Sequence, residues 1–138
     1  MIRCLAALRA LVGLALIAGG CAAVAQASPT GGDGSGQCSF VLTPPKVVQA
    51  SGVTVVMAAM HPGPCPTDAE PNSSVVCLSI AGDGTPGQCA SKMGRDPAIV
   101  YYTYQPGATY VVKGLGCAST FLPPYTVCQN FGPSQTTV

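Results

Sequence analysis

Six cysteines constrain this chain more than any other feature of its sequence. They are spread between positions 38 and 128, at Cys38, Cys65, Cys77, Cys89, Cys117 and Cys128. An even number of cysteines in a small exported domain indicates three disulfides. A zinc site is excluded by the spacing, because no C-x₂-C or C-x₄-C pair occurs and the single histidine cannot complete a Cys₂His₂ set. We therefore expect a small fold stapled by disulfides, with no metal site.

The first residues of the chain have the pattern of a secretory signal peptide over 1–27. Arg3 and Arg9 precede an apolar run, Ala10–Ala18, and a small-residue cleavage pattern follows at 25–27. A membrane-spanning helix would need about 18 or more uninterrupted apolar residues, and this run is much shorter. We expect a secreted protein with no transmembrane segment.

Cys21 supports an alternative to secretion after cleavage at residue 27. The residues before it, 17–20, resemble a loose bacterial lipobox, in which the cysteine is acylated and becomes the first residue. Ala18 stands where such motifs usually have leucine. The alternative localisation is therefore a lipid anchor through Cys21.

The rest of the chain divides into three parts. Residues 28–37 are expected to be a flexible glycine-rich leader, because this composition cannot bury apolar surface. Residues 38–131 form the domain, and residues 132–138 are expected to fray. A chain of 138 residues allows one domain.

Short strands separated by Gly and Pro turns fill the domain. Pro44-Pro45 removes two backbone donors, so the first strand is an edge strand in two pieces. In the next strand, the alternation assigns Val53, Val55, Met57 and Ala59 to the core. A later strand has Val76, Leu78 and Ile80 facing inward and Cys77 facing outward.

About seven such strands, with no amphipathic helix after residue 27, predict an all-β, antiparallel sandwich of the immunoglobulin-like kind. The turn Pro106-Gly107 followed by Tyr110 resembles the approach to strand F of immunoglobulin domains. Tyr110 precedes Cys117 by seven residues rather than two, and the chain has no tryptophan. The whole pattern resembles the small exported six-cysteine β-domain proteins of actinobacteria, whose function is unknown.

The strand assignment also predicts disulfide pairs. Cys77 faces outward and meets Cys89 on the returning strand, which makes this the most secure pair. The other four can pair as Cys38–Cys128 with Cys65–Cys117, which we prefer, or as Cys38–Cys65 with Cys117–Cys128.

The residues needed for catalysis are scarce. His61 is the only histidine and lies at the start of a proline-rich loop, so a nucleophile–histidine pair has little support. Met57, Met60, His61 and Cys65 would suit copper, but Met57 and Met60 are three apart and face opposite sides of a strand. After residue 27, four Lys and Arg stand against five Asp and Glu, which excludes a basic surface for nucleic acid. We expect neither an enzyme nor a cofactor.

Surface recognition remains as the expected function, for a monomer that binds an unknown protein or cell-envelope partner. Two proline-rich loops, 61–73 and 118–124, should lie at the same end of an immunoglobulin-like sandwich. The candidate partner-binding residues are His61, Pro64, Pro66, Phe121 and Leu122. Phe121 and Leu122 could instead fold back to cap the core. Alternative functions are a secreted protease inhibitor that uses loop 61–73, and a lipid-anchored structural protein of the cell envelope.

The two readings of the N-terminus predict different masses for the exported protein. We expect cleavage after Ala27, so that the mature chain starts at Ser28, because 25–27 matches a cleavage site better than 17–20 matches a lipobox. The intact mass of the exported form measures this. A diacylated chain that starts at Cys21 would overturn the prediction.

Overall fold

A computed structural model describes residues 37–138 as an all-β sandwich of eight strands. The predicted signal peptide, Cys21 and all but the last residue of the predicted leader lie outside the described residues. No helix long and apolar enough to cross a membrane occurs within 37–138. The strands are β1 (Phe40–Leu42), β2 (Lys46–Ala50), β3 (Val53–Pro62), β4 (Ala69–Ile80), β5 (Gln88–Met93), β6 (Ala98–Thr103), β7 (Thr109–Thr120) and β8 (Thr126–Thr137).

The first sheet is built around β3. On one side β3 pairs with β1 and then β2, and on the other side it pairs with β6, all antiparallel. β1 and β2 follow one another along the same edge of β3, because Pro44-Pro45 separates them. The predicted edge strand in two pieces is therefore confirmed.

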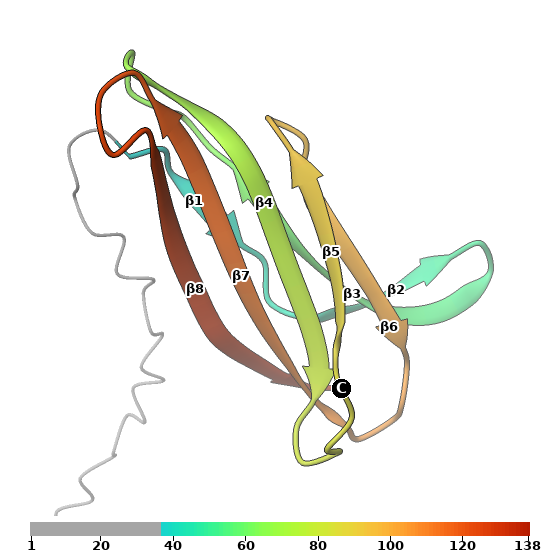
Figure 1. Ribbon diagram of the computed structural model, residues 1–138. Helices are drawn as coiled ribbons and strands as arrows, with labels where there is room; N and C mark the ends of the chain where they lie inside the picture. Colours follow the sequence, from blue (N-terminus) through green and yellow to red (C-terminus); the bar gives the residue numbers. More distant parts are fainter. Residues whose placement is uncertain (1–36) are drawn as a thin grey trace, which may run out of the picture.

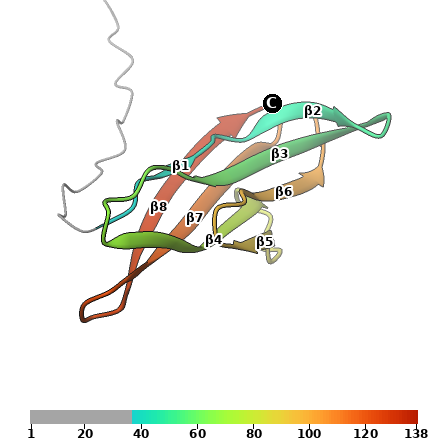
Figure 2. The ribbon, with the colours of Figure 1, turned by 90° about the horizontal axis from the view of Figure 1, so that it is seen from above.

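The second sheet has the order β5-β4-β7-β8, also antiparallel throughout, and packs against the first (Figures 1 and 2). Strands β3 and β6 share one sheet, as strands B and E do in immunoglobulin domains. Strands β4, β7 and β8 share the other sheet, as strands C, F and G do. The predicted sandwich is confirmed, with eight strands rather than about seven.

Tyr110, at the start of β7, joins the two sheets. Its hydroxyl donates to the carbonyl oxygen of Thr103 at the end of β6 (2.6 Å) and accepts from the N–H of Gln105 (2.9 Å). The ring is fully buried and packs edge-on against Tyr102, with ring centroids 6.0 Å apart. This arrangement is a tyrosine corner. The position two residues later, a core cysteine in antibody domains, is Val112, which is also fully buried.

Two glycines of β7 let the sheets approach closely. A Cβ at Gly116 would lie 2.6 Å from Cδ1 of Phe40, and one at Gly114 would lie 2.9 Å from Sδ of Met60. Real Cβ atoms do not approach other atoms so closely, so any larger residue at these positions would require the side chain of Phe40 or Met60 to shift. The ring of Phe40 also packs against Phe131 of β8, with centroids 6.2 Å apart. The short strand β1 therefore lies directly over β7.

The predicted core face of β3 is wrong. Val56, Ala58 and Met60 belong to the core, so Val53, Val55 and Met57 point to the outer side of the first sheet. Ala59 alternates with the core residues as well, but it is buried, at 1% exposure. Both sets of positions in β3 are apolar, so its alternation does not distinguish them. In β4 the prediction is right, since Val76 and Leu78 are fully buried.

The last residues of the chain do not fray. β8 continues to Thr137, and residues 134–137 pair with 109–112 of β7. Val138 N–H also donates to the carbonyl oxygen of Ala108 (3.1 Å). A register shift between Val112 and Gly114 accommodates Gly132-Pro133, the residues that suggested a strand end.

All six cysteines of the described residues form disulfides, and none of these joins a strand of one sheet to a strand of the other. Cys77–Cys89 is confirmed, and the two residues are directly opposite each other in β4 and β5. The preferred pairing of the other four is wrong, because the structure has Cys38–Cys65 and Cys117–Cys128. Cys117 lies directly opposite Cys128 in the β7–β8 ladder, whereas Cys65 lies in the loop after β3, close to Cys38.

The tyrosine corner can be tested by removing one oxygen atom. Tyr110→Phe leaves the carbonyl of Thr103 and the N–H of Gln105 without their partner, so we expect the free energy of unfolding to fall by about 1–3 kcal/mol. The matched control is Tyr101→Phe on the outer side of β6, for which we expect a change within about 0.5 kcal/mol. Denaturant unfolding measures both. Equal effects of the two substitutions would contradict the assigned role of the corner.

Candidate functional site

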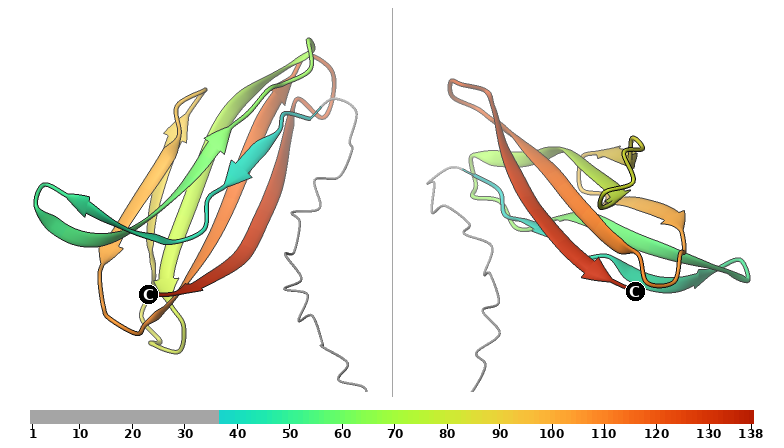
Figure 3. Two further views of the ribbon diagram at one scale, coloured as in Figure 1. Left: turned by 180° about the vertical axis from the view of Figure 1, so that it is seen from behind. Right: turned by 90° about the horizontal axis from the view of Figure 1, so that it is seen from below.

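The two predicted loops meet at the end of the sandwich where β7 turns into β8. The β4–β7 ladder extends to the pair Ala69 and Thr120, and beyond it the N–H of Phe121 donates to the carbonyl oxygen of Asp68 (3.3 Å). The predicted proximity of the loops is therefore confirmed. Figure 3 shows that the β7–β8 turn projects beyond the neighbouring strands.

Both loops are shorter than predicted. His61 and Pro62 belong to β3, and residues 69–73 belong to β4, so the first loop is 63–68. The second loop is 121–125, because β7 continues to Thr120. Strand β4 contains Pro71 at a register shift of its ladder with β7. The proline-rich sequence around it had predicted a loop instead.

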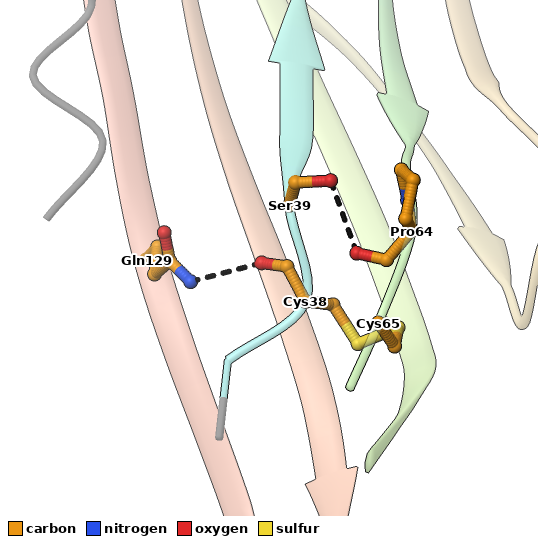
Figure 4. Close-up of a disulfide and its surroundings, with 5 residues drawn as sticks. All are labelled: Cys38, Ser39, Pro64, Cys65 and Gln129. Carbon is orange, nitrogen blue, oxygen red and sulfur yellow. Dashed lines mark hydrogen bonds between the residues drawn. A yellow bond between two sulfur atoms is a disulfide. The ribbon is translucent and has the colours of Figure 1, made fainter. Parts of the chain in front are cut away.

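The first loop is fastened to the start of β1 (Figure 4). The carbonyl oxygen of Pro64 accepts from the backbone N–H (2.9 Å) and the hydroxyl (3.0 Å) of Ser39, and the N–H of Gly63 donates back to the carbonyl oxygen of Ser39 (2.8 Å). Cys38 and Cys65, which are adjacent in sequence to Ser39 and Pro64, form a disulfide beside these hydrogen bonds. Gln129 of β8 donates from Nε2 to the carbonyl oxygen of Cys38 (3.2 Å), which ties the second sheet to the same point.

The second loop presents apolar side chains to solvent. Phe121, Leu122 and Tyr125 are 73%, 72% and 61% exposed, and Pro123 and Pro124 are exposed as well. We call residues 121–125 the apolar tip. The alternative in which Phe121 and Leu122 cap the core is therefore wrong.

Hydrogen bonds hold the apolar tip in one conformation. The N–H of Tyr125 donates to the carbonyl oxygen of Leu122 (3.0 Å), and the N–H of Thr120 donates to that of Tyr125 (3.0 Å). The hydroxyl of Thr120 also donates to Leu122 (2.8 Å). Tyr125 has φ +63°, a conformation that is unusual for a bulky side chain and that tends to occur at functional sites.

Carboxylates flank the apolar tip. Asp68 precedes β4, and Glu70 lies opposite Ser119 of β7, so both are next to the tip in the sheet, and both side chains are exposed. The Lys and Arg residues of the described part of the chain lie on other elements, at Lys46, Lys92, Arg95 and Lys113. The tip thus combines an apolar surface with a negative rim.

The structure separates the other predicted candidates. Pro64 and Pro66 are exposed in the first loop, near the tip. His61 is exposed in β3, opposite Val41 of β1, and so lies on the first sheet rather than in the loop. The sequence analysis did not include Tyr125 among the candidate partner-binding residues. Its position directly after Pro123-Pro124, in the same loop as Phe121 and Leu122, could have indicated it.

Asn72 begins the sequence Asn72-Ser73-Ser74, which fits the N-x-S/T pattern of glycosylation sites, and it is half-buried in β4. Its side-chain Nδ2 donates to the hydroxyl of Ser119 (2.9 Å), and its backbone carbonyl oxygen accepts from the N–H of Gly94 (2.7 Å). Ser74 is fully buried. Asn72 therefore has a structural role in joining β4 to β7 and to the β5–β6 turn.

Comparisons with family models, with curated proteins and with solved structures found no match to this chain. The immunoglobulin-like fold therefore rests on the strand order described above, and the resemblance to exported actinobacterial proteins stays a prediction.

The Cys117–Cys128 disulfide lies below the apolar tip, and its effect there can be separated from its effect on overall stability. It closes a loop of 11 residues, while Cys77–Cys89 closes one of 12, so loss of either should cost about 3 kcal/mol by chain entropy. We expect Cys117→Ala with Cys128→Ala to speed hydrogen exchange at the N–H groups of Thr120 and Tyr125 more than the paired alanine substitutions at 77 and 89 do. Equal exchange in the two variants would contradict a local clamp.

Proposed function

We propose that this chain is an exported, non-catalytic recognition domain that binds a protein partner through the apolar tip. The observation that carries the proposal is the exposure of Phe121, Leu122 and Tyr125 on a loop that is already ordered. Exposed apolar side chains are normally scattered, and a contiguous group on a rigid loop is typical of a binding surface. A loop ordered before binding loses little conformational entropy in the complex.

The tip suggests the chemistry of the partner. Three large side chains on one narrow turn suit insertion into an apolar pocket, where a few anchors supply most of the binding energy. Asp68 and Glu70 favour a pocket with a cationic rim. The same two carboxylates disfavour binding to an anionic lipid surface, because insertion of the tip would bring like charges together. The partner that fits is a protein with an apolar pocket surrounded by Lys or Arg.

The protease inhibitor is less well supported. An inhibitor loop offers its backbone to the enzyme, but in loop 63–68 the N–H of Gly63 and the carbonyl oxygens of Pro64 and Pro66 are already bound within the domain. The lipid-anchored structural protein depends on Cys21, which lies outside the described residues.

The proposal is tested with the double substitution Phe121→Ser and Leu122→Ser in the exported protein. Because both side chains are exposed, the free energy of unfolding should stay within about 0.5 kcal/mol of the wild type. Proteins captured by the wild type from the producing cells' envelope are identified, purified and titrated against each variant. We expect the double variant to bind at least about tenfold more weakly.

The matched control is Met93→Ser, which removes an equally exposed apolar side chain from β5. It should bind the purified partner as the wild type does. A partner that binds the tip variant with unchanged affinity would overturn the proposed site, whereas a large loss of stability in that variant would show that the tip belongs to the core.

A further inference from the structure

The three disulfides differ in how far their cysteines are exposed to solvent. In the Cys77–Cys89 pair, Cys89 is exposed and Cys77 is half-buried. Each of the other pairs has one buried residue, since Cys117 is 7% exposed and Cys38 is 1% exposed. Among the disulfides of residues 37–138, Cys77–Cys89 is therefore the one in which neither cysteine is buried.

A lysine lies beside this disulfide. Lys113 of β7 is directly opposite Cys77 of β4, which is directly opposite Cys89 of β5, so the three residues form a row across neighbouring strands (Figure 1). The residues on either side of Cys77 and of Lys113 are buried, so both side chains point to the outer side of the second sheet. Opposite residues of an antiparallel pair have Cβ atoms about 4.5–5.5 Å apart, which brings the Lys113 ammonium group within reach of Sγ of Cys77.

The carboxylates of residues 37–138 lie away from this lysine. Asp68 and Glu70 are at the end of β4 next to the apolar tip. Asp83 is in the β4–β5 turn, and Asp96 is in the β5–β6 turn. None of them is directly opposite Lys113 or diagonal to it in the sheet. The positive charge of Lys113 is therefore available to a negative charge that develops on Cys77.

Exposure and charge together favour one direction of thiol–disulfide exchange at this pair. An external thiolate attacks Sγ of the exposed Cys89, the Sγ–Sγ bond breaks, and its electron pair leaves on Sγ of Cys77. The products are a mixed disulfide at Cys89 and a thiolate at Cys77. The ammonium group of Lys113 stabilises that thiolate, and a better stabilised leaving thiolate departs faster.

The same attack is less favourable at the other two disulfides. Attack on the exposed Cys128 leaves the thiolate on Cys117, and attack on the half-buried Cys65 leaves it on Cys38. Both of these leaving sulfurs belong to buried residues, where a charge without a partner is costly. The residue opposite Cys117 on β4 is Ser73, which carries no charge.

We propose that Cys77, Cys89 and Lys113 form a reactive site that exchanges its disulfide with two neighbouring cysteine thiols of another protein. After the first attack, the second substrate thiolate attacks the mixed disulfide and releases Cys89 as a thiolate. Two substrate thiols are thereby oxidised to a disulfide, Cys77–Cys89 is reduced to two thiols, and the two protons of the substrate thiols pass to Cys77 and Cys89. Each chain oxidises one pair of thiols, without turnover and independently of the apolar tip.

The fold allows this disulfide to open without loss of the sandwich. Strand β5 stays paired with β4 over residues 88–93 and 73–78 through the backbone. The turn after β5 is also held, because the N–H of Gly94 donates to the backbone carbonyl oxygen of Asn72 (2.7 Å). The other two disulfides lie on other elements and remain closed.

Timed reduction of the native protein by dithiothreitol tests the proposal. Free thiols are trapped with N-ethylmaleimide, and peptide mapping gives the reduction rate of each disulfide. We expect Cys77–Cys89 to be reduced at least about tenfold faster than either of the other two. In denaturing guanidinium the three rates should lie within about threefold of one another, because burial no longer distinguishes them. With free cysteine as a monothiol, the first mixed disulfide should map to Cys89.

The role of the lysine is tested by its charge. Lys113→Met should slow the reduction of Cys77–Cys89 about fivefold at low ionic strength, whereas Lys113→Arg should stay within about 1.5-fold of the wild type. Added salt should bring the wild-type rate toward that of Lys113→Met, which a purely structural role would not do. The matched control is Lys92→Met on β5, where Lys92 alternates with Cys89 and points to the opposite side, and its rate should stay within about 1.5-fold of the wild type.

Reduction of another disulfide first, or of all three at one rate in the native protein, would overturn the proposal. A rate for Lys113→Met equal to that of the wild type at low salt would overturn it as well, and so would a first mixed disulfide at Cys77. The double serine variant of the apolar tip retains all three residues of the reactive site and should be reduced as the wild type is. Failure of the reactive site is therefore distinguishable from failure of the proposed partner site.

Discussion

The structure depends on apolar packing between two sheets that no disulfide connects. Cys77–Cys89 and Cys117–Cys128 each join two strands of the second sheet, and Cys38–Cys65 joins the residues before β1 to the loop after β3. The sheets meet through a core that includes Met60, Leu78 and Val112, with Tyr110 at one end. The hydrogen bonds of Tyr110 to the end of β6, and of Gln129 to Cys38, fix how one sheet lies over the other. This sandwich thus has a tyrosine corner without a disulfide between its sheets, and Val112 occupies the position that is a core cysteine in antibody domains.

The sequence predicts the fold well wherever polar and apolar residues alternate. In β4, Cys77 and Ser79 separate Val76, Leu78 and Ile80, so the inward face follows directly from the period of a strand. In β3 the same reasoning fails, because apolar residues occupy both faces. The strand's inner side depends instead on which of its faces meets the second sheet, and that is a property of the tertiary structure.

Prediction of the candidate site from the sequence is limited by tertiary structure in the same way. The meeting of the two loops follows from an immunoglobulin-like strand order, but their lengths depend on how far the β4–β7 ladder continues past Pro71. The exposure of Phe121 and Leu122 also could not be derived, because an apolar loop residue can pack inward or project. The role of Gly116 also depends on the tertiary structure, because the absence of a side chain at this position makes room for the ring of Phe40.

The order of the disulfides along the chain has a consequence for how the protein is made. The first cysteine of the domain pairs with the second, the third with the fourth, and the fifth with the sixth. A chain that enters an oxidising compartment with its N-terminus first exposes each cysteine just before its native partner. Oxidation in order of arrival therefore produces the native set, and no bridge has to be broken to admit a later one.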